Sequence, residues 1–400
     1  MTAKTPVLAA ALETLPPFPF ARLARLLGEG PSADCINMAI GEPQHAPPPI
    51  LAERLAANAA LWGKYPPVNG TPDYRAAVVE WANRRYGLPA GFVDPDTMVL
   101  PVAGTREALY LLAQTVCGPR AGGRPLVLVP NPFYQVYGGA AAMAGAELMP
   151  VPGSGGPAAQ PDYSALPPDV LDRVALAYLC SPANPQGNVA DTDLLARNIA
   201  AARRHGYVLA ADECYSEIWD KAAPPGALAV MAGLGEGLAN VVVLNSLSKR
   251  SSAPGLRAGF IAGDPALIEA FTRVRSHGAA GSPLPSLAAA AALWRDEEHV
   301  AVNRDLYRAK IDIAERLLAG RFGFVRPQGG FFLWLDVEDG EAATLKLWRD
   351  ARIRVLPGAY LAADGADGLN PGRRFIRVAL VHDLATTETA LARLSQVLGG

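Results

Sequence analysis

The middle of the chain alternates between short apolar runs and longer stretches with helical periodicity. Several of the apolar runs have no polar position, as in strands that helices cover on both faces. Between them, the polar and apolar positions predict helices that include residues 106–116, 191–205 and 265–277. This alternation predicts an α/β fold with a mostly parallel sheet. Its seven expected strands are residues 98–102, 126–130, 147–151, 174–180, 207–212, 241–246 and 258–263.

The pattern changes after about residue 300. A long amphipathic stretch at residues 300–318 predicts a helix, and the runs FFLWLDV, IRVLPG and RFIRVAL that follow predict three strands. We therefore expect a smaller α+β unit here, completed by the N-terminal segment. A chain of 400 residues also exceeds the size at which one core usually stops growing. The expected division is an N-terminal arm with part of the small domain at 1–50, a large domain at 51–300 and a small domain at 301–400.

The charge balance excludes two classes of protein. The chain has 36 Lys and Arg residues, 38 Asp and Glu residues and a formal net charge of −2. It therefore resembles neither a basic nucleic-acid binder nor an acidic disordered tail. No apolar stretch approaches the roughly 18 residues that cross a bilayer. The short apolar run at residues 6–12 is followed by Glu13, and we interpret it as an arm of the mature protein. We expect no nucleic-acid or membrane partner.

The cysteines and histidines do not suggest a metal site or disulfide bonds. Cys35, Cys117, Cys180 and Cys214 form no C-x-x-C pair, and the five histidines form no H-E-x-x-H pair. Isolated cysteines of this kind are typical of a reducing compartment. We therefore expect a cytoplasmic protein without a metal.

Polar clusters follow several of the predicted strands, at the strand ends where open α/β sheets bind ligands. Gly104, Thr105 and Arg106 follow the first strand and open a helix. Free backbone N–H groups at such a helix start can bind phosphate. A glycine and a threonine before a helix are more often an ordinary cap, so this cluster alone is weak evidence for a phosphate site.

Two further clusters follow the fourth and fifth strands. In SPANPQG, two prolines fix the backbone around Asn184, whose amide can then donate and accept hydrogen bonds at set positions. The same residue types are common in ordinary loops. The fifth strand ends at Asp212, with Tyr215 just beyond it, but an aspartate at a strand end is commonly a solvated cap. These clusters decide little by themselves.

The most specific segment is VVVLNSLSKRSSAPGLRAGF. It places Ser246, Ser248, Lys249 and Arg257 between two predicted strands, in the pattern S-x-x-K-x₄-P-G-x-R-x-G. A single lysine would most often be a solvated surface residue. The pattern fixes the residue type at six positions, and its chance appearance in a chain of this size is on the order of 10⁻⁵. Chance therefore does not explain it.

These motifs, in this order, resemble the fold-type I pyridoxal-phosphate enzymes and, within them, the class I/II aminotransferases. The resemblance covers nearly the whole chain, from about Gly41 to Ala379. It implies that pyridoxal 5'-phosphate is the cofactor and that Lys249 binds it as an imine. It further implies that Asp212 pairs with the pyridine nitrogen and that Tyr215 bonds the ring hydroxyl.

The resemblance also implies roles for residues around the cofactor and the substrate. Asn184 would contact the ring hydroxyl and the substrate carboxylate, although the family pattern N-P-x-N-P-x-G has Ser181 in place of its first asparagine here. Gly41 and Arg377 would bind the substrate, Arg377 through its α-carboxylate. The remaining positions implied to bind the cofactor are the backbone of Gly104, Thr105 and Arg106, the ring of Tyr134, and the side chains of Ser246, Ser248 and Arg257.

General chemistry agrees with these roles. A carboxylate such as Asp212 keeps a ring nitrogen protonated, so that the ring withdraws electrons. A freed Lys249 amine can take the Cα proton and return it to the cofactor. The guanidinium of Arg377 suits a planar carboxylate because it donates two parallel hydrogen bonds. The alternative for Arg377 is a surface arginine at a strand end.

A finer resemblance suggests the substrate and the assembly. SLSKRSSAPGLRAGF, LPPFPFARLARLL and NPFYQVYGGAAAMAGA are similar to segments of succinyldiaminopimelate aminotransferases. This implies amino-group transfer between N-succinyl-2,6-diaminopimelate and 2-oxoglutarate, in lysine biosynthesis. Aminotransferases for aspartate, alanine or aromatic amino acids, and a pyridoxal-phosphate-dependent β-lyase, remain alternatives. Tyr65 matches a tyrosine that reaches the phosphate in the neighbouring subunit, which implies a homodimer.

Two other functions fit the sequence less well. A nicotinamide-dependent dehydrogenase needs its G-x-G-x-x-G after a strand, whereas Gly233, Gly235 and Gly237 precede one. A transcription regulator with this fold would add a basic helix-turn-helix domain, for which the chain has no spare residues.

Overall fold

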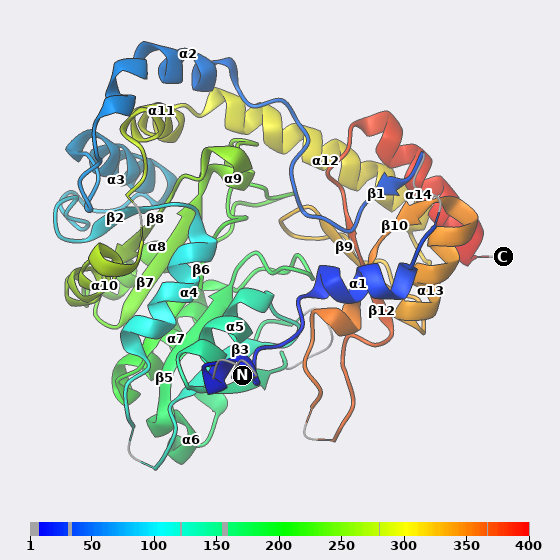
Figure 1. Cartoon of the computed structure of the whole chain (residues 1–400), viewed down its shortest axis with the longest axis horizontal. Helices are drawn as coiled ribbons and strands as arrows, with labels where there is room; N and C mark the ends of the chain where they lie inside the picture. Colours follow the sequence, from blue (N-terminus) through cyan, green and yellow to red (C-terminus); the bar gives the residue numbers. More distant parts are fainter. Residues whose placement is uncertain are drawn as a thin grey trace, which may run out of the picture.

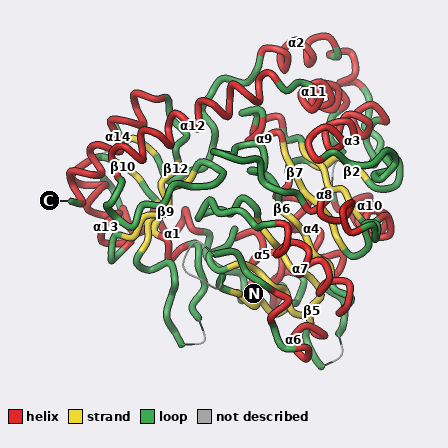
Figure 2. The backbone as a smooth tube through the Cα atoms, turned by 180° about the vertical axis from the view of Figure 1, so that it is seen from behind, coloured by secondary structure: helices red, strands yellow, loops and turns green. Residues whose placement is uncertain are grey.

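A computed structural model describes residues 8–30, 34–120, 122–153, 159–279, 281–365 and 367–399. Figure 1 shows a large part built around one sheet and a smaller part beside it, with the long helix α12 (Glu298–Leu318) running from the large part into the smaller one. The same division is visible from behind in Figure 2. Within the described residues, no helix is both long enough and apolar enough to cross a membrane.

The large part contains a seven-stranded sheet in the order β2-β8-β7-β6-β5-β3-β4. Strand β8 is antiparallel to both of its neighbours, whereas the other pairs in the sheet are parallel. The predicted α/β fold with seven mostly parallel strands is therefore confirmed. The strands are β2 (Val99–Val102), β3 (Leu126–Pro130), β4 (Glu147–Val151), β5 (Val174–Cys180), β6 (Val208–Asp212), β7 (Val241–Ser246) and β8 (Gly259–Gly263).

Helices cover both faces of this sheet. Alternate residues of a strand point to opposite faces, so Leu126 and Leu128 join one apolar core while Val127 and Val129 join the other. This explains why most of the central strands have no polar position. The first core includes α3 (Pro72–Tyr86), α7 (Thr192–His205), α8 (Ala227–Leu234) and α11 (Leu284–Arg295), and the second includes α4 (Thr105–Val116), α5 (Gln135–Met143) and α10 (Pro265–Gly278).

Local sequence signals set the helix limits. The side chain of Asp191 caps the start of α7 by accepting a hydrogen bond from the Leu194 N–H, and Gly206 ends the helix with a φ of 67°. Shorter helices connect the larger elements. They are α2 (Pro49–Ala57), α6 (Pro168–Arg173), α9 (Leu247–Arg250) and the 3₁₀ turns at Ala10–Leu12, Ala59–Gly63, Tyr163–Ala165, Pro254–Leu256 and Gly358–Tyr360.

The smaller part has its own core around the antiparallel sheet β11-β12-β9. The N-terminal segment lies against it, because β1 (Ile36–Asn37) pairs with β10 (Ile353–Arg354) and α1 (Pro19–Leu27) packs nearby. The other elements are β9 (Phe332–Asp336), α13 (Gly340–Lys346), a π-helical turn (Leu347–Ala351), β11 (Leu356–Pro357), β12 (Phe375–Ala379) and α14 (Leu384–Leu398).

One predicted strand is divided in two. The run IRVLPG forms β10 and β11, which pair with different partners, β1 and β12. Val355 lies between them and is fully buried. Two short pairings replace one strand because the N-terminal segment offers β10 an edge that the local sequence could not reveal. The domain limits at residues 50 and 300 stay a prediction.

Candidate active site

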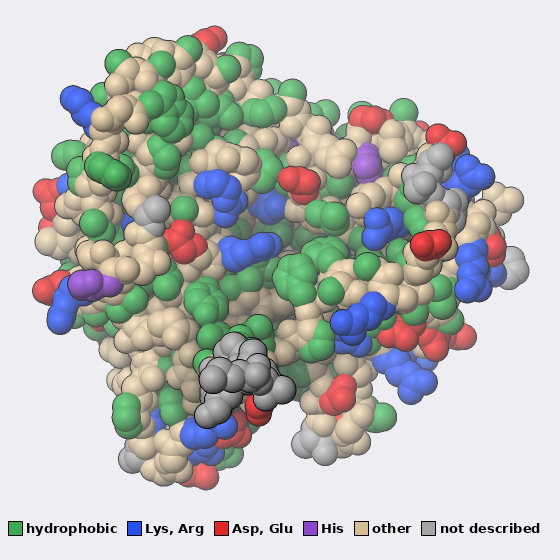
Figure 3. Space-filling model, viewed as in Figure 1, with side chains coloured by type: hydrophobic (Ala, Val, Ile, Leu, Met, Phe, Trp, Pro, Cys, Tyr) green, Lys and Arg blue, Asp and Glu red, His purple; other side chains and the backbone are tan. Residues whose placement is uncertain are grey.

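A cavity of about 450 Å³ lies where the ends of β5, β6 and β7 face the smaller part. Figure 3 shows the molecule in the same view as Figure 1, with Lys and Arg side chains near the middle, between the large part and the smaller part. The cavity brings together all the predicted site residues except Gly104, which adjoins its wall, and Tyr65. The predicted residues that line it are Gly41, Thr105, Arg106, Tyr134, Asn184, Asp212, Tyr215, Ser246, Ser248, Lys249, Arg257 and Arg377.

One end of the cavity is suited to a phosphate. Helix α4 begins there, and its N-cap Gly104 offers no side chain, so N–H groups of the first turn are free to bind an anion. The φ of Gly104 is 81°, and a Cβ at this position would lie 2.3 Å from Nη2 of Arg257. Only glycine therefore allows the Arg257 guanidinium to approach the helix start. Arg257 donates to the backbone oxygens of Ala103 and Pro254, at 2.9 and 3.0 Å.

Two serine hydroxyls lie at the same end. The Ser246 hydroxyl donates to the Ser248 oxygen at 2.9 Å, and the Ser248 N–H donates back to the Ser246 oxygen at 3.1 Å. Ser246 ends β7 and is buried. Together with Arg257, these hydroxyls supply the donors that phosphate recognition requires.

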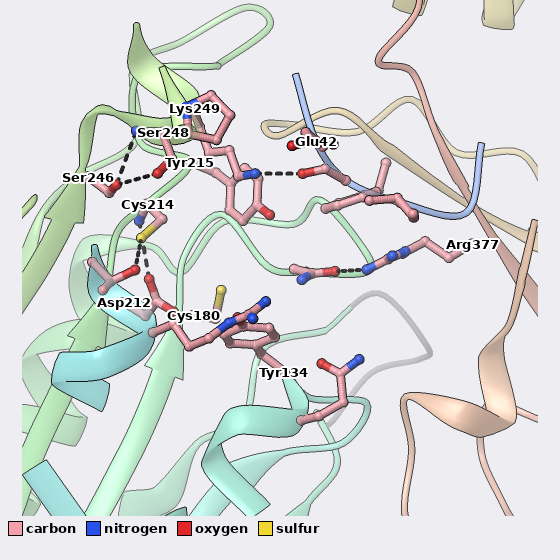
Figure 4. A pocket seen from close by; sticks show the side chains of 18 of the residues that line it. Glu42, Tyr134, Cys180, Asp212, Cys214, Tyr215, Ser246, Ser248, Lys249 and Arg377 are labelled. Atoms are coloured by element: carbon pink, nitrogen blue, oxygen red, sulfur yellow. Dashed lines mark hydrogen bonds between the residues drawn. The ribbon is translucent and has the colours of Figure 1, made fainter. Parts of the chain in front are cut away.

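Asp212 ends β6 inside the cavity and is buried. Burial raises the pKa of its carboxyl. Hydrogen bonds to the charged form act in the opposite direction and lower this pKa, by less than burial raises it. The Tyr137 hydroxyl donates to Oδ2 at 2.7 Å, and the Cys214 N–H donates to Oδ1 at 3.3 Å. Asp212 is therefore a fixed carboxylate at the floor of the cavity, visible in Figure 4.

Aromatic side chains form part of the walls. The Tyr134 hydroxyl accepts a hydrogen bond from Nε of Arg106 at 2.8 Å, and the Tyr134 ring meets the Tyr137 ring edge-on at 5.7 Å. Tyr215 is buried against Phe331 and Phe332, and burial holds the pKa of its hydroxyl well above the usual range. Tyr134 and Tyr215, the two predicted aromatic residues, therefore both line the cavity.

Lys249 lies on α9, and its Nζ donates to the backbone oxygen of Gly41 at 2.5 Å (Figure 4). Burial lowers the pKa of Lys249 to about 8, because a low-dielectric surrounding disfavours the charged amine. A larger fraction of this lysine is therefore uncharged near neutral pH than of an exposed one, as a nucleophilic amine requires. Gly41 itself has no space for a side chain, since a Cβ would lie 2.5 Å from the Phe332 ring.

Arg377 lies on β12 and is only 3% exposed. Its Nη1 donates to Oδ1 of Asn184 at 2.9 Å, and its Nη2 donates to the Ala39 backbone oxygen at 2.7 Å. No carboxylate among the described residues forms an ion pair with it, and burial lowers the pKa of its guanidinium to about 10. A buried cation without an anionic partner is costly, so this site suits a ligand carboxylate.

Several residues at or behind the cavity wall were not predicted from the sequence. The most important is Tyr137, which lies behind the wall and contacts Asp212. Its place three residues after Tyr134 in NPFYQVY was the available signal, because residues three apart on a helix share a face. Cys214 was also missed, and its Sγ lies 3.0 Å from the Thr105 hydroxyl. The other wall residues that were not predicted are Ile40, Gln135, Cys180 and Phe332.

Tyr65 does not reach the cavity of its own chain. It lies after the 3₁₀ turn at residues 59–63 and is fully exposed, at 100%. Nothing in a single chain tests its predicted contact with a neighbouring subunit.

A half-buried lysine of lowered pKa, a buried carboxylate and a helix start suited to phosphate lie together on this sheet, as in the fold-type I pyridoxal-phosphate enzymes. The family model for aminotransferases of class I and II matches residues 33–394. The chain belongs to this family.

Curated relatives and solved structures agree with this assignment. An aminotransferase structure from Neisseria meningitidis is 39% identical, has a TM-score of 0.90, and covers 97% of this chain and 99% of its own. A 4-dedimethylamino-4-oxo-anhydrotetracycline transaminase from Streptomyces rimosus is 34% identical over 90% of this chain and 93% of its own length. An LL-diaminopimelate aminotransferase from Desulforudis audaxviator is 30% identical, and the match covers 97% of both proteins.

Pyridoxal 5'-phosphate is the cofactor of this family, and the described residues fit it. The start of α4, Arg257 and the serine hydroxyls can hold its phosphate. Asp212 offers a buried anion for a ring nitrogen, and Lys249 offers an amine of lowered pKa.

Proposed function

We propose that this aminotransferase moves an amino group between N-succinyl-2,6-diaminopimelate and 2-oxoglutarate. The observation that carries the proposal is a second cavity, of about 860 Å³, that adjoins the cofactor cavity. The two cavities share Phe18, Arg106, Gln135 and Arg257 in their walls. A long acyclic substrate needs such additional volume beyond the reacting carbon.

The second cavity contains a cation that suits the distant end of this substrate. Arg22 of α1 lines it, and the Arg22 guanidinium lies 3.9 Å from the centre of the Tyr360 ring. No ion pair of Arg22 with a carboxylate is found among the described residues. Its donors are therefore available for a remote carboxylate, which would be costly to bury without a partner.

The similar proteins support a diaminopimelate substrate in general terms. Several relatives at about 30% identity are named LL-diaminopimelate aminotransferases. Unmodified diaminopimelate is a second candidate, because Asp364 lines the same cavity as Arg22. A carboxylate and a guanidinium in one cavity would suit a distal ammonium and carboxylate, whereas the succinylated substrate has no free distal ammonium.

The proposed catalytic roles follow from the geometry of the cavity. The bound cofactor withdraws electrons from the substrate Cα when its ring nitrogen is protonated. Asp212, fixed by Tyr137, keeps that nitrogen protonated. The Lys249 amine would take the Cα proton and deliver it to the cofactor, and the Gly41 backbone oxygen accepts a hydrogen bond from this amine. Arg377 and Asn184 hold the α-carboxylate of both substrates.

The test compares kcat/KM for succinylated diaminopimelate, unmodified diaminopimelate, aspartate and an aromatic amino acid, with 2-oxoglutarate as acceptor. We expect the succinylated substrate to have the highest value. Arg22→Gln should lower this value about tenfold to 100-fold, as for a lost hydrogen bond to a charged group. Arg25→Gln, on the exposed side of the same helix, is the matched control.

A higher kcat/KM for aspartate or for an aromatic amino acid would contradict the proposed substrate. Pyruvate release from cystathionine at a comparable rate would favour the β-lyase alternative. A higher value for unmodified diaminopimelate would favour the second candidate.

We also propose that the protein acts as a homodimer in the cytoplasm, where its four free cysteines would stay reduced. Trp62, Tyr65 and Val68 are exposed together, at 58%, 100% and 38%, and exposed aromatic residues of this kind favour an interface. Sedimentation should give a dimer at micromolar concentration, and Tyr65→Phe should weaken cofactor retention. A fully active monomer would contradict the shared site.

A further inference from the structure

Lys249 forms a hydrogen bond at each of its ends, and both bonds connect it to one short segment of the chain, one directly and one through Asn303. At the side-chain end, its Nζ donates directly to the backbone oxygen of Gly41 at 2.5 Å. At the backbone end, the Lys249 carbonyl accepts a hydrogen bond from Nδ2 of Asn303 at 3.0 Å. Asn303 in turn contacts His45, only four residues after Gly41. The segment Gly41–His45 therefore forms both a direct and an indirect contact with the same lysine.

The side-chain amide of Asn303, on α12, forms four hydrogen bonds that connect three segments of the chain. Its Nδ2 donates to the backbone oxygens of Lys249 and Arg250, at 3.0 and 3.2 Å. Its Oδ1 accepts from the Ser252 hydroxyl at 3.0 Å and lies 2.8 Å from Nδ1 of His45. An amide has two donors and two acceptor positions, so every hydrogen-bonding position of Asn303 is occupied and its orientation is set.

The other side of His45 contacts a buried lysine. Nζ of Lys310 lies 2.6 Å from Nε2 of His45, and an ammonium can only donate. Nε2 must therefore accept, which leaves the proton on Nδ1 for donation to Asn303. The contacts thus select one tautomer of His45 and give the network a single direction, from Lys310 through His45 to Asn303.

Lys310 has an unusual environment for a lysine. It is 0% exposed, and no carboxylate among the described residues forms an ion pair with it. Its other contacts are the Leu380 backbone oxygen at 3.2 Å and the Tyr307 ring at 4.8 Å. Burial lowers its pKa to about 8. Burying an amine in this way costs free energy, and the hydrogen bond to His45 recovers part of it.

The segment is also anchored on its N-terminal side. The Met38 backbone oxygen accepts a hydrogen bond from the Ala379 N–H of β12 at 2.8 Å. The Gly41 carbonyl therefore lies between an anchor on β12 and an anchor on α12. Both anchors hold the carbonyl that faces the Lys249 amine.

We propose that Lys310, His45 and Asn303 form a positioning network that fixes the Lys249 amine in the active site. Lys310 and His45 hold the segment that carries the Gly41 carbonyl, and Asn303 holds the Lys249 backbone. None of the three residues lines the cofactor cavity, so each acts through Lys249. The network does not depend on which amino acid is the substrate.

The test measures the holoenzyme without substrate. His45→Ala removes both hydrogen bonds of the imidazole. We expect the release rate of bound cofactor to rise about tenfold, as for the loss of one buried hydrogen bond. The circular dichroism in the visible band of the bound cofactor, divided by cofactor content, should fall to half or less, because this signal depends on a fixed orientation.

Three further variants separate positioning from general stability. His45→Gln should restore both signals to within twofold, since its amide can accept from Lys310 and donate to Asn303. Lys310→Met should behave as His45→Ala does and replaces it if His45→Ala does not fold. His299→Ala is the matched control, because this histidine lies on α12, as Asn303 and Lys310 do, and contacts Asp296 and Ser251 but not Lys249. It should leave both signals unchanged.

Two results would overturn the proposal. In the first, His45→Ala or Lys310→Met lowers the melting temperature but leaves cofactor release and the dichroism per cofactor at wild-type values. In the second, His299→Ala changes both signals as much as His45→Ala does. Either result would reduce the network to an ordinary stabilising contact.

Discussion

The floor and the roof of the active site differ in how the chain builds them. The floor consists of Cys180, Asp212 and Ser246, which are the last residues of β5, β6 and β7. Sheet register places Cys180 beside Asp212 and Asp212 beside Leu244, two residues before Ser246 on β7. All three side chains are buried, and their positions follow from backbone hydrogen bonds of the largest sheet.

The roof consists of Phe18, Gly41, Phe332 and Arg377, which come from segments far apart in the sequence. No single sheet holds all of them. Long-range contacts do so instead, such as the hydrogen bond from Arg377 to the Ala39 backbone oxygen. The hydrogen bond between Arg377 and Asn184 joins the roof to a loop beside the floor.

This difference indicates that the floor and the roof have different functions. A site made from strand ends is rigid and suits the steps common to every substrate, whereas segments joined by a few contacts can differ between related enzymes. We therefore expect changes in the floor to abolish or slow the chemistry, and changes in the roof to act on substrate binding.

The largest expected effect comes from Lys249→Ala. The variant loses the amine that binds the cofactor and moves the proton, so kcat should fall by at least about 10⁴-fold. Borohydride reduction of the wild-type holoenzyme, followed by peptide mapping, should label Lys249. A label on exposed Lys221 or on buried Lys310 would contradict the assignment.

Asp212→Asn should lower kcat about 10²-fold to 10³-fold, a size typical of a lost electrostatic contact in an active site. The variant keeps the volume of the side chain and an acceptor for Tyr137. Glu213→Gln is the control, because Glu213 is the next residue and is equally buried. Its carboxylate faces the other side of the sheet, where it accepts hydrogen bonds from the Tyr86 hydroxyl and the Ala227 N–H. Equal losses in both variants would show that burial of any carboxylate here matters, and not the position of Asp212.

Arg377→Lys tests the roof. Lysine keeps the charge but loses the paired donors, so we expect KM to rise about tenfold or more for both the amino acid and the oxo acid, with a smaller change in kcat. Arg374→Lys is the control, since Arg374 is exposed and paired with Asp336. A fall in kcat with unchanged KM would place Arg377 with the floor residues and remove the distinction.

Tyr137→Phe should have the smallest effect, a decrease in kcat/KM of about tenfold or less, as for one hydrogen bond. The Tyr137 hydroxyl stabilises the charged form of Asp212 and so lowers its pKa. Removing it raises this pKa, so a smaller fraction of Asp212 is ionised at low pH. The acid limb of the pH profile should therefore move to higher pH, and an unshifted limb would contradict the role of Tyr137.

The fold could be predicted from the sequence to the extent that it depends on local patterns. Each predicted strand of the large sheet exists because its apolar positions serve two cores at once. The order of the strands, the reversal of β8 and the division of IRVLPG into β10 and β11 could not be predicted in this way. They depend on which edges meet, and pairing partners leave no periodicity in either strand.

The site shows the same limit. Lys249, Asp212 and Arg257 belong to short motifs, so their gathering at one cavity could be predicted. Tyr137 belongs to such a motif too, but its contact with Asp212 depends on how α5 packs on the sheet. His45 and Lys310 are 265 residues apart, and no motif connects them.

By itself, the sequence determined the family, the cofactor and two of the three floor residues, Asp212 and Ser246, because these depend on residue types at fixed spacing within short motifs. Only the tertiary structure decided the two-sided environment of Lys249, the isolation of Arg377 from any acidic partner in the described residues, and the second cavity beside Arg22. Each of these features depends on contacts between segments that are distant in the chain. Such contacts are set by packing and burial of the whole molecule, which a local pattern does not encode.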